Sequence, residues 1–317
     1  MNKVIIILGP TGVGKTGASI LLARRLATEI ISADSMQIYR GMDIGTAKPP
    51  ARIREEVRHH MIDIVSPTES YSVGQYLTTV VPIIEQLHQK GLLPIIVGGT
   101  GLYITALTRG LFRGPPADQT LRDEMLSMEK NEKGILYSHL RHMDPATAEN
   151  IKSNDTRRIV RALEVCINTK SKMSSMQRMF TNPLPYTFKR IGLIRDRSEL
   201  YRMLEERVDS MIASGLIQEV STILDMIPDR TPLQAIGYKE IAQYLSENIS
   251  REEAIRLVKR NTKRYAKRQL TWFRKDPAIH WVDISGVHNS ETICRMITDT
   301  LLEHNITGNL GQLTTLL

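Results

Sequence analysis

A glycine-rich segment near the start of the chain has the residue types and the spacing that bind phosphate. Residues 9–16 read Gly-Pro-Thr-Gly-Val-Gly-Lys-Thr, between an apolar run and a stretch with helical periodicity. In that context the glycines let backbone N–H groups point inward, the helix N-terminus adds positive potential, and the lysine neutralises phosphate oxygens. We therefore predict a phosphate or diphosphate site made of Gly9, Pro10, Thr11, Gly12, Val13, Gly14, Lys15 and Thr16.

The same segment predicts Mg²⁺ as a cofactor, with the hydroxyl of Thr16 as a metal ligand. Hydrolases of nucleoside triphosphates usually place an aspartate at the end of a second strand to organise the metal. Here the apolar run 94–97 ends in Gly-Gly-Thr-Gly instead. Asp63 lies inside another apolar run, where a structural role explains it equally well. The pattern fits a loop that holds a diphosphate leaving group without hydrolysing it.

Two polar side chains follow the ends of predicted strands. Asp34 comes after the apolar run 29–32, and Thr100 comes after the run 94–97. In an open parallel sheet ligands bind beyond the carboxyl ends of the strands, so both residues should share one rim with the phosphate loop. Asp34 is therefore a candidate general base, and the Thr100 hydroxyl could orient a substrate. The alternative for each residue is a helix or turn N-cap.

These residues need a parallel sheet to bring them to one edge, and the chain has the pattern of such a sheet. Short apolar runs rich in β-branched residues alternate with helical stretches, which is typical of a doubly wound α/β fold. The expected strands are 4–8, 29–32, 61–65, 94–97, 190–194 and 280–284. We therefore predict the fold class as α/β, a P-loop-type parallel sheet flanked by helices.

This pattern of strands is interrupted in the middle of the chain. Between a Gly-Pro-Pro sequence at 114–116 and an Asn-Pro-Leu-Pro sequence at 182–185, charged helical sequence dominates and no convincing strand is present. We expect an inserted all-helical subdomain over 114–189. Residues 1–113 and 190–317 would then form a P-loop-like catalytic core.

The overall composition is that of an ordinary globular protein, with 317 residues, 41% hydrophobic and 24% charged. No apolar run approaches the roughly 18 residues that span a bilayer, and the start of the chain lacks a signal-peptide pattern. We therefore expect a cytoplasmic protein with no membrane partner. Cys166 and Cys294 stand alone, which argues against a disulfide framework or a zinc site. The tail after Asn305 is expected to fray.

The net charge of +8 is concentrated in one segment. Residues 256–275 contain nine basic residues and no acidic residue, so the remainder of the chain carries 8 − 9 = −1. Lys-Arg doublets at 259, 263 and 267 recur every four residues and form a stripe on one helical face. We predict that this stripe, including Lys263 and Lys267, binds nucleic-acid phosphates. A solubilising surface and a membrane-surface helix are the alternatives.

Five motifs in register, beginning with residues 9–16, resemble one known family. The other four are Asp-Ser-Met-Gln-Ile-Tyr-Arg at 34–40, Gly-Gly-Thr-Gly-Leu-Tyr at 98–103, Arg-Arg-Ile-Val-Arg-Ala-Leu-Glu-Val at 157–165 and Gly-Tyr-Lys-Glu at 237–240. Together they are similar to the tRNA dimethylallyltransferases, also called tRNA isopentenyltransferases. The resemblance extends to Gln-Leu-Thr-Trp-Phe-Arg at 269–274. One departure is Gly12, where the family often has alanine; glycine should leave the phosphate loop intact.

The resemblance implies a reaction and assigns roles to the residues. The donor would be dimethylallyl diphosphate, and the acceptor would be the exocyclic amine of the adenine just 3′ of the anticodon. Asp34 would accept the amine proton and Thr100 would help fix the reacting groups, while an arginine would bind the diphosphate. Arg207 is the preferred candidate for that arginine, and Arg202 is the weaker one.

The resemblance also implies tRNA contacts, with the insertion gripping the anticodon stem-loop. The adenine must be extruded from the loop, and protein contacts must offset that cost. Besides Asp34 and Thr100, the implied contact residues are Ser35, Met36, Gln37, Arg122, Arg157, Arg158, Ile159, Val160, Arg161, Gly237, Tyr238, Lys239, Lys263 and Lys267. Without the family, arginines at such a spacing are more often a solvated helix face.

Two other functions remain compatible with a phosphate loop. A small-molecule or nucleoside kinase shares such a loop, but it accounts neither for the basic stripe nor for the sequence around Asp34. A nonenzymatic RNA-binding NTPase switch would explain the basic stripe and would be indifferent to Asp34→Asn. We expect a monomer, because binding of tRNA would use much of the exposed surface.

Overall fold

The computed structural model describes residues 2–112 and 114–303. Backbone contacts divide the chain into two units: unit 1 comprises residues 1–104 and 185–317, and unit 2 comprises residues 105–184. The expected insertion at 114–189 therefore starts and ends later than unit 2 does. The insertion was expected to run to residue 189, but the strand β5 of unit 1 already begins at Thr187. The expected fraying of the tail after Asn305 concerns residues outside the described ranges.

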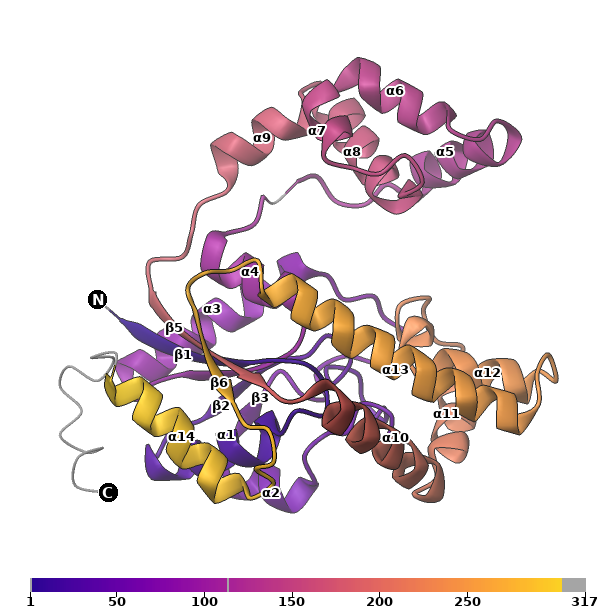
Figure 1. Cartoon of the computed structure of the whole chain (residues 1–317). Coiled ribbons are helices and arrows are strands. Elements are labelled where there is room, and N and C mark those ends of the chain that lie inside the picture. Colours follow the sequence, from indigo (N-terminus) through magenta and orange to yellow (C-terminus); the bar gives the residue numbers. More distant parts are fainter. Residues whose placement is uncertain (1, 113, 304–317) are drawn as a thin grey trace. The chain divides into compact units, whose positions relative to one another are not determined.

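Unit 1 is built on a six-stranded sheet with the strand order β3-β2-β4-β1-β5-β6 (Figure 1). All neighbouring strands are parallel. Their apolar runs are buried because helices cover both faces of the sheet. The strands are β1 (Lys3–Leu8), β2 (Ile30–Ala33), β3 (His59–His60), β4 (Ile95–Gly98), β5 (Thr187–Ile194) and β6 (Ile279–Asp283). The predicted parallel α/β fold is confirmed.

One expected strand is wrong. Residues 61–65 form no ladder, and β3 covers only the two histidines before them. Met61 and Asp63 have φ angles of 65° and 56°, in the left-handed region that an extended strand excludes. The carboxylate of Asp63 forms ion pairs with Lys48 and Arg54, each at 2.5 Å. Of the metal-organising and structural roles that the sequence left open for Asp63, these contacts favour the structural one.

Helices cover both faces of this sheet. Helices α1 and α14 lie side by side on one face, and α3 and α4 lie on the other (Figure 1). Ile5 and Ile7 of β1 pack with Leu22 of α1 and Ile297 of α14 in the main core. The helices are α1 (Lys15–Arg25), α2 (Ala51–Glu56), α3 (Val73–Gln89), α4 (Gly101–Arg109), α10 (Arg197–Ala213), α11 (Leu216–Asp225), α12 (Tyr238–Leu245), α13 (Arg251–Phe273) and α14 (Ser290–Glu303), with a short 3₁₀ helix at Pro232–Gln234. Of these, α4 extends past residue 104 into unit 2.

The regular secondary structure of unit 2 is all helical in its described residues, as the sequence predicted. Its own core joins Met125, Leu136, Leu140 and Leu163 from three helices. The helices are α5 (Gln119–Asn131), α6 (Ile135–Met143), α7 (Pro145–Glu149), α8 (Thr156–Thr169) and α9 (Met173–Phe180). A separate core means that this unit has its own source of stability.

Neither cysteine takes part in a disulfide, and both Cys166 and Cys294 are buried thiols. Among residues 2–112 and 114–303 no three acidic, histidine or cysteine side chains gather as metal ligands. In the same part of the chain, no helix combines the length and the apolar character needed to cross a bilayer.

Candidate functional site

Three strand ends meet at one edge of the sheet and carry the predicted site residues. In the parallel register, Leu8 of β1 and Ala33 of β2 both pair with Gly98 of β4. The segments that follow these three residues therefore start side by side. They are the phosphate loop, the segment that begins with Asp34, and the turn that contains Thr100.

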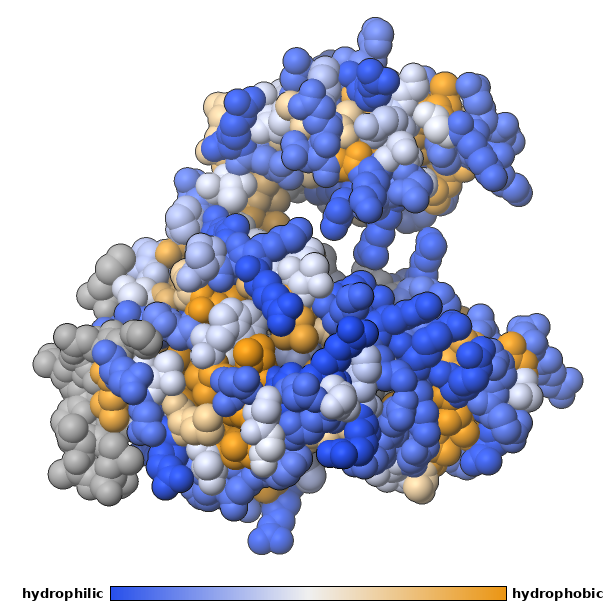
Figure 2. All heavy atoms as spheres, viewed as in Figure 1, coloured by the Kyte–Doolittle hydropathy of each residue, from blue (hydrophilic) through white to orange (hydrophobic). Residues whose placement is uncertain are grey.

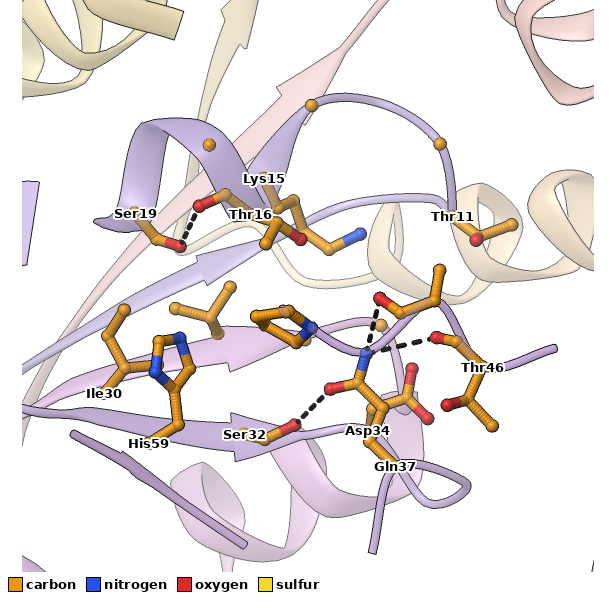
Figure 3. Close-up of a pocket in the computed structure, with 18 of the residues that line it drawn as sticks. Thr11, Lys15, Thr16, Ser19, Ile30, Ser32, Asp34, Gln37, Thr46 and His59 are labelled. Atoms are coloured by element: carbon orange, nitrogen blue, oxygen red, sulfur yellow. Dashed lines mark hydrogen bonds between the residues drawn. The ribbon is translucent and has the colours of Figure 1, made fainter. Parts of the chain in front are cut away.

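A cavity of about 250 Å³ lies between these segments. In Figure 3, Lys15 and Thr16 stand on one side of the cavity, and Asp34 and Gln37 stand on the other. Its further lining residues include Thr11, Gly12, Gly14, Thr46, His59, Gly99, Arg207 and Gln269. Five of the eight predicted loop residues thus line one cavity with Asp34, whereas Gly9, Pro10 and Val13 are not among its lining residues.

The phosphate loop is held closely against α10. Gly12 has a φ angle of 76°, and a β-carbon there would lie 2.6 Å from a methyl carbon of Leu204. Glycine fits here without displacing Leu204, whereas alanine would require that side chain to shift. Val13 is fully buried and is not among the residues that line the cavity, and its N–H donates to the carbonyl of Pro10 at 3.4 Å. Helix α1 starts at Lys15, which places the positive end of the helix dipole at the cavity.

Lys15 lies folded over its own loop. Its Nζ donates hydrogen bonds to the carbonyls of Gly9 at 2.9 Å and Pro10 at 2.7 Å. Burial lowers the pKa of Lys15 to about 7, although the nearby Asp34 carboxylate opposes this and Arg207 adds to it. An anionic ligand in the cavity would restore the preference of this amine for its charged form.

Arg207 reaches the cavity because of the periodicity of α10. Leu200, Leu204 and Val208 of this helix are buried, and Arg207 lies one turn beyond Leu204. Burial lowers the pKa of the Arg207 guanidinium, and the Asp34 carboxylate opposes that shift. Arg202, the weaker candidate, is exposed and does not line the cavity.

Asp34 and Thr100 are held by short-range hydrogen bonds. The Oδ1 atom of Asp34 accepts from the backbone N–H of Met36 at 2.9 Å. Over the described ranges this is the only hydrogen bond of the Asp34 carboxylate, which leaves it oxygen atoms for a substrate. The Thr100 hydroxyl accepts from the N–H of Ser35 at 3.0 Å and lies 3.3 Å from the Ser35 hydroxyl. The Tyr265 hydroxyl lies near it.

The Gln37 amide is engaged by neighbouring groups. Its Nε2 donates to the carbonyl of Thr46 at 3.2 Å, and its Oε1 accepts from the Ser32 hydroxyl at 3.1 Å (Figure 3). The side chain lines the cavity but would have to exchange one of these bonds to bind the edge of a base. Ser35 and Met36 are half-buried beside it.

Four of the implied tRNA contacts are contradicted by burial. Ile159 and Val160 are 2% and 6% exposed and belong to the core of unit 2. Tyr238 is fully buried, and its hydroxyl donates to Glu219 at 2.5 Å. Gly237 is also buried. These residues were included because they lie within contiguous motifs, but their side chains or backbone face inward.

The arginines of unit 2 fall into two groups. Arg122 donates two hydrogen bonds, of 2.7 and 2.8 Å, to the fully buried Glu164, and Arg161 also forms an ion pair with that carboxylate. Both arginines therefore organise unit 2, and their implied contacts with RNA stay predictions. Arg157 and Arg158 are exposed, as an RNA-binding role requires, and Arg158 also forms an ion pair with Asp155 at 3.4 Å.

The basic stripe of α13 is divided in the same way. Lys259 and Lys263 form ion pairs with Asp209 at 2.6 Å and Glu205 at 2.5 Å, both on α10. The predicted contact of Lys263 with tRNA would therefore require its ion pair with Glu205 to open. Lys267 is exposed, and so are Arg264, Arg268 and, on α12, Lys239. Figure 2 shows strongly hydrophilic side chains along the visible face of α13.

Sequence reasoning missed several residues that line the cavity. Gln269, His59 and Thr46 were not among the predicted site residues, although all three line it. Gln269 lies in a motif that the family resemblance covers, so that motif was the available signal. Burial lowers the pKa of His59, and its Nδ1 atom lies 2.6 Å from the carbonyl of Val57.

Comparisons with known proteins agree with this geometry. A family model described as IPP transferase matches residues 37–276, and one described as isopentenyl transferase matches residues 2–66. A tRNA dimethylallyltransferase of Thermodesulfovibrio yellowstonii is 52% identical over 309 residues, covering 95% of this chain and 98% of the relative.

Solved structures are similar over nearly the whole chain. The full-length tRNA isopentenylpyrophosphate transferase of Bacillus halodurans is 42% identical with a TM-score of 0.70, covering 96% of this chain and 98% of that one. A eukaryotic dimethylallyltransferase acting on tRNA is 29% identical with a TM-score of 0.80, covering 96% of this chain and 80% of that one.

Proposed function

The chain belongs to the tRNA dimethylallyltransferase family, and we propose that it prenylates tRNA at the cavity described above. The reaction transfers the dimethylallyl group of dimethylallyl diphosphate to the exocyclic amine of the adenine 3′ of the anticodon. The observation that supports it best is the meeting of three strand ends, which puts a phosphate loop and a carboxylate on opposite sides of one cavity.

The cationic side of the cavity suits the leaving group. As the C–N bond forms, the C–O bond to diphosphate breaks, and diphosphate leaves with the electron pair of that bond. Lys15, Arg207 and the N-terminus of α1 lie where this charge develops. Fixed positive groups stabilise a leaving group most effectively in a partly desolvated site.

The opposite side of the cavity suits the acceptor. The exocyclic amine of adenine is a weak nucleophile, so a base that accepts its proton during attack should accelerate the reaction. Asp34 is the carboxylate that lines the cavity, and it retains oxygen atoms for that proton. Thr100 lies in the turn next to it and fixes the Asp34 segment through the N–H of Ser35.

The donor set also fits the predicted Mg²⁺. The Thr16 hydroxyl lines the cavity at the start of α1, and Mg²⁺ typically keeps several waters and takes substrate oxygens with few protein ligands. Thr16 would therefore hold the ion together with diphosphate oxygens. When bound, Mg²⁺ would neutralise charge on the leaving group.

The exposed cations support binding of the tRNA substrate. Arg157, Arg158, Lys239 and Lys267 are exposed and remain candidates for contacts with RNA phosphates. Extrusion of the adenine costs a few kcal/mol, which such contacts and the cavity would offset. A monomeric state and a cytoplasmic location stay predictions.

One experiment separates this proposal from a kinase. Purified protein is incubated with Mg²⁺, labelled dimethylallyl diphosphate and a tRNA transcript with adenine 3′ of the anticodon. A matched transcript with guanine at that position serves as the control. We expect label on adenosine of the first transcript alone. Absence of transfer, with ATP consumed and a small molecule phosphorylated, would replace the transferase with a kinase.

A further inference from the structure

Helix α13 reaches the site through one buried side chain, Gln269. Its Oε1 accepts a hydrogen bond from the backbone N–H of Thr11 at 2.8 Å, and its Nε2 donates one to the carbonyl of Gly99 at 2.8 Å. Gln269 is 6% exposed, so water competes little for either bond. This one side chain joins the phosphate loop to the turn that leads to Thr100.

The approach of Gln269 to that turn is unusually close. A β-carbon at Gly99 would collide with the Nε2 atom of Gln269. The same β-carbon would lie 3.3 Å from the carbonyl oxygen of Gly9. Gly99 therefore allows both the amide of Gln269 and the phosphate loop to contact one turn of backbone.

Tyr265, one turn earlier on α13, strengthens this connection. Its hydroxyl lies near Thr100 and Gln269, and burial raises its pKa so that the hydroxyl stays protonated. The guanidinium carbon of Arg268 lies 5.7 Å from the centre of the Tyr265 ring. Helix α13 thus contacts both loops of the site through adjacent turns, while its exposed cations lie on the surface.

We propose that Gln269 is a positioning residue that sets the distance between the phosphate loop and the Thr100 turn. It thereby aligns the donor diphosphate with the acceptor amine, and this inference rests on the proposed function. The Thr11 N–H is used by Gln269, so the backbone of Thr11 has a fixed position, and Thr11 still lines the cavity. An error of about 1 Å in such an alignment can slow a reaction about a hundredfold.

The test compares two identical substitutions at different sites. Gln269→Met keeps the length of the side chain and removes both hydrogen bonds, and Gln243→Met makes the same change at an exposed position of α12. For each variant we would measure kcat and KM for dimethylallyl diphosphate, Kd for tRNA, Kd for inorganic diphosphate, and Tm. Wild-type protein shows whether the proposed transfer occurs at all.

We expect Gln269→Met to lower kcat at least about tenfold, because misalignment raises the barrier of the chemical step. Both Kd values should change less than about threefold, since neither ligand's own contacts are removed. A kcat equal to that of Gln243→Met would overturn the inference. So would a loss of kcat that is matched by equal losses in tRNA affinity and Tm, because that pattern belongs to general structural damage.

A second substitution tests the same connection from the other side. Gly99→Ala should displace the Gln269 amide and reproduce the loss of kcat. Combined with Gln269→Met it should add little, because residues that act through one contact show non-additive effects. Fully additive losses would contradict the inference. A wild-type protein without transfer activity would instead refute the proposed function.

Discussion

Two carboxylates, one in each unit, have two cationic side chains around them, and the two centres are built differently. In unit 2, Glu164 is fully buried and forms ion pairs with both Arg122 and Arg161. In unit 1, Asp34 faces Lys15 and Arg207 across the cavity. Within residues 2–112 and 114–303, no carboxylate lies within ion-pair distance of Lys15 or Arg207.

This difference separates charges that organise the fold from charges available to a ligand. The hydrogen bond to Glu164 raises the pKa of Arg122, so the pair stabilises the charged form. Burial lowers the pKa of Lys15 and of Arg207, so their charged forms lose solvation without a contacting counterion. A buried cation without a counterion is costly, and an anionic ligand can supply the missing negative charge.

The largest effect should come from Asp34, the carboxylate of the centre in unit 1. Asp34→Asn keeps the shape of the side chain but removes a base, so the rate of prenyl transfer should fall about a thousandfold. Single-turnover transfer of labelled donor to tRNA measures it. Binding of tRNA should be retained, because the amide can keep the hydrogen bond to Met36. An Asp34→Asn variant with near wild-type turnover would remove Asp34 as the base.

Replacing an arginine by glutamine should affect activity in one centre and stability in the other. Arg207→Gln should lower kcat/KM for dimethylallyl diphosphate about a hundredfold, because it removes charge from the diphosphate side of the cavity. Arg122→Gln should leave kcat/KM for this donor nearly unchanged and lower thermal stability instead. Steady-state kinetics and thermal unfolding on both variants decide the comparison, which fails if Arg122→Gln shows the donor defect.

The Glu164 centre in unit 2 should contribute mainly to stability. Glu164→Gln leaves two arginines without their counterion, and we expect a loss of about 2 kcal/mol, reduced from the fully buried case because both arginines are partly exposed. Hydrogen exchange in unit 2 would measure it.

The pH dependence of that loss has a defined sign. The arginines and the N–H of Asp118 hold the pKa of Glu164 below its usual value of 4.5, against the effect of burial. The folded state then binds fewer protons than the unfolded state, so the contribution is fully present above pH 4.5 and is lost as the pH falls through the folded-state pKa. A difference between wild type and Glu164→Gln that persists unchanged at lower pH would contradict this assignment.

The smallest effect concerns the basic stripe of α13. Lys267→Ala should weaken tRNA binding a few-fold and reduce the slope of log Kd against log salt by about 1, as expected for one phosphate contact. Lys263→Ala is the matched control, because its amine is paired with Glu205. Salt titrations of tRNA affinity measure both slopes. Equal slopes for the two variants would mean that the ion pair with Glu205 opens when RNA binds.

The sequence identified the elements whose signal is local. Runs such as 4–8 and 94–97 lie almost entirely within strands because they are apolar, β-branched and buried on both faces. The phosphate loop and Asp34 followed from the rule that ligands bind at the carboxyl ends of parallel strands. The predicted strand at 61–65 was wrong because an apolar run does not reveal the left-handed backbone at Met61 and Asp63.

The remaining errors have a common physical cause. Arg161 and Glu164 have the i, i+3 spacing of a helical ion pair, but no local pattern in the sequence shows that Arg122 joins them from α5. The role of Gln269 depends on Thr11 and Gly99, which lie far away along the chain. The burial of Ile159 and Val160, by contrast, was accessible from helical periodicity, since their neighbours 162 and 163 are also apolar.

The ion pairs between α10 and α13 also constrain how this chain can vary in length. Lys259 and Lys263 anchor the middle of α13 to α10, and Gln269 meets the loops a turn and a half later. Inserting one residue between 263 and 269 would rotate the rest of the helix by about 100°, which would turn Gln269 away from both loops. Insertions and deletions should therefore be rarer in this short stretch than substitutions of its exposed side chains.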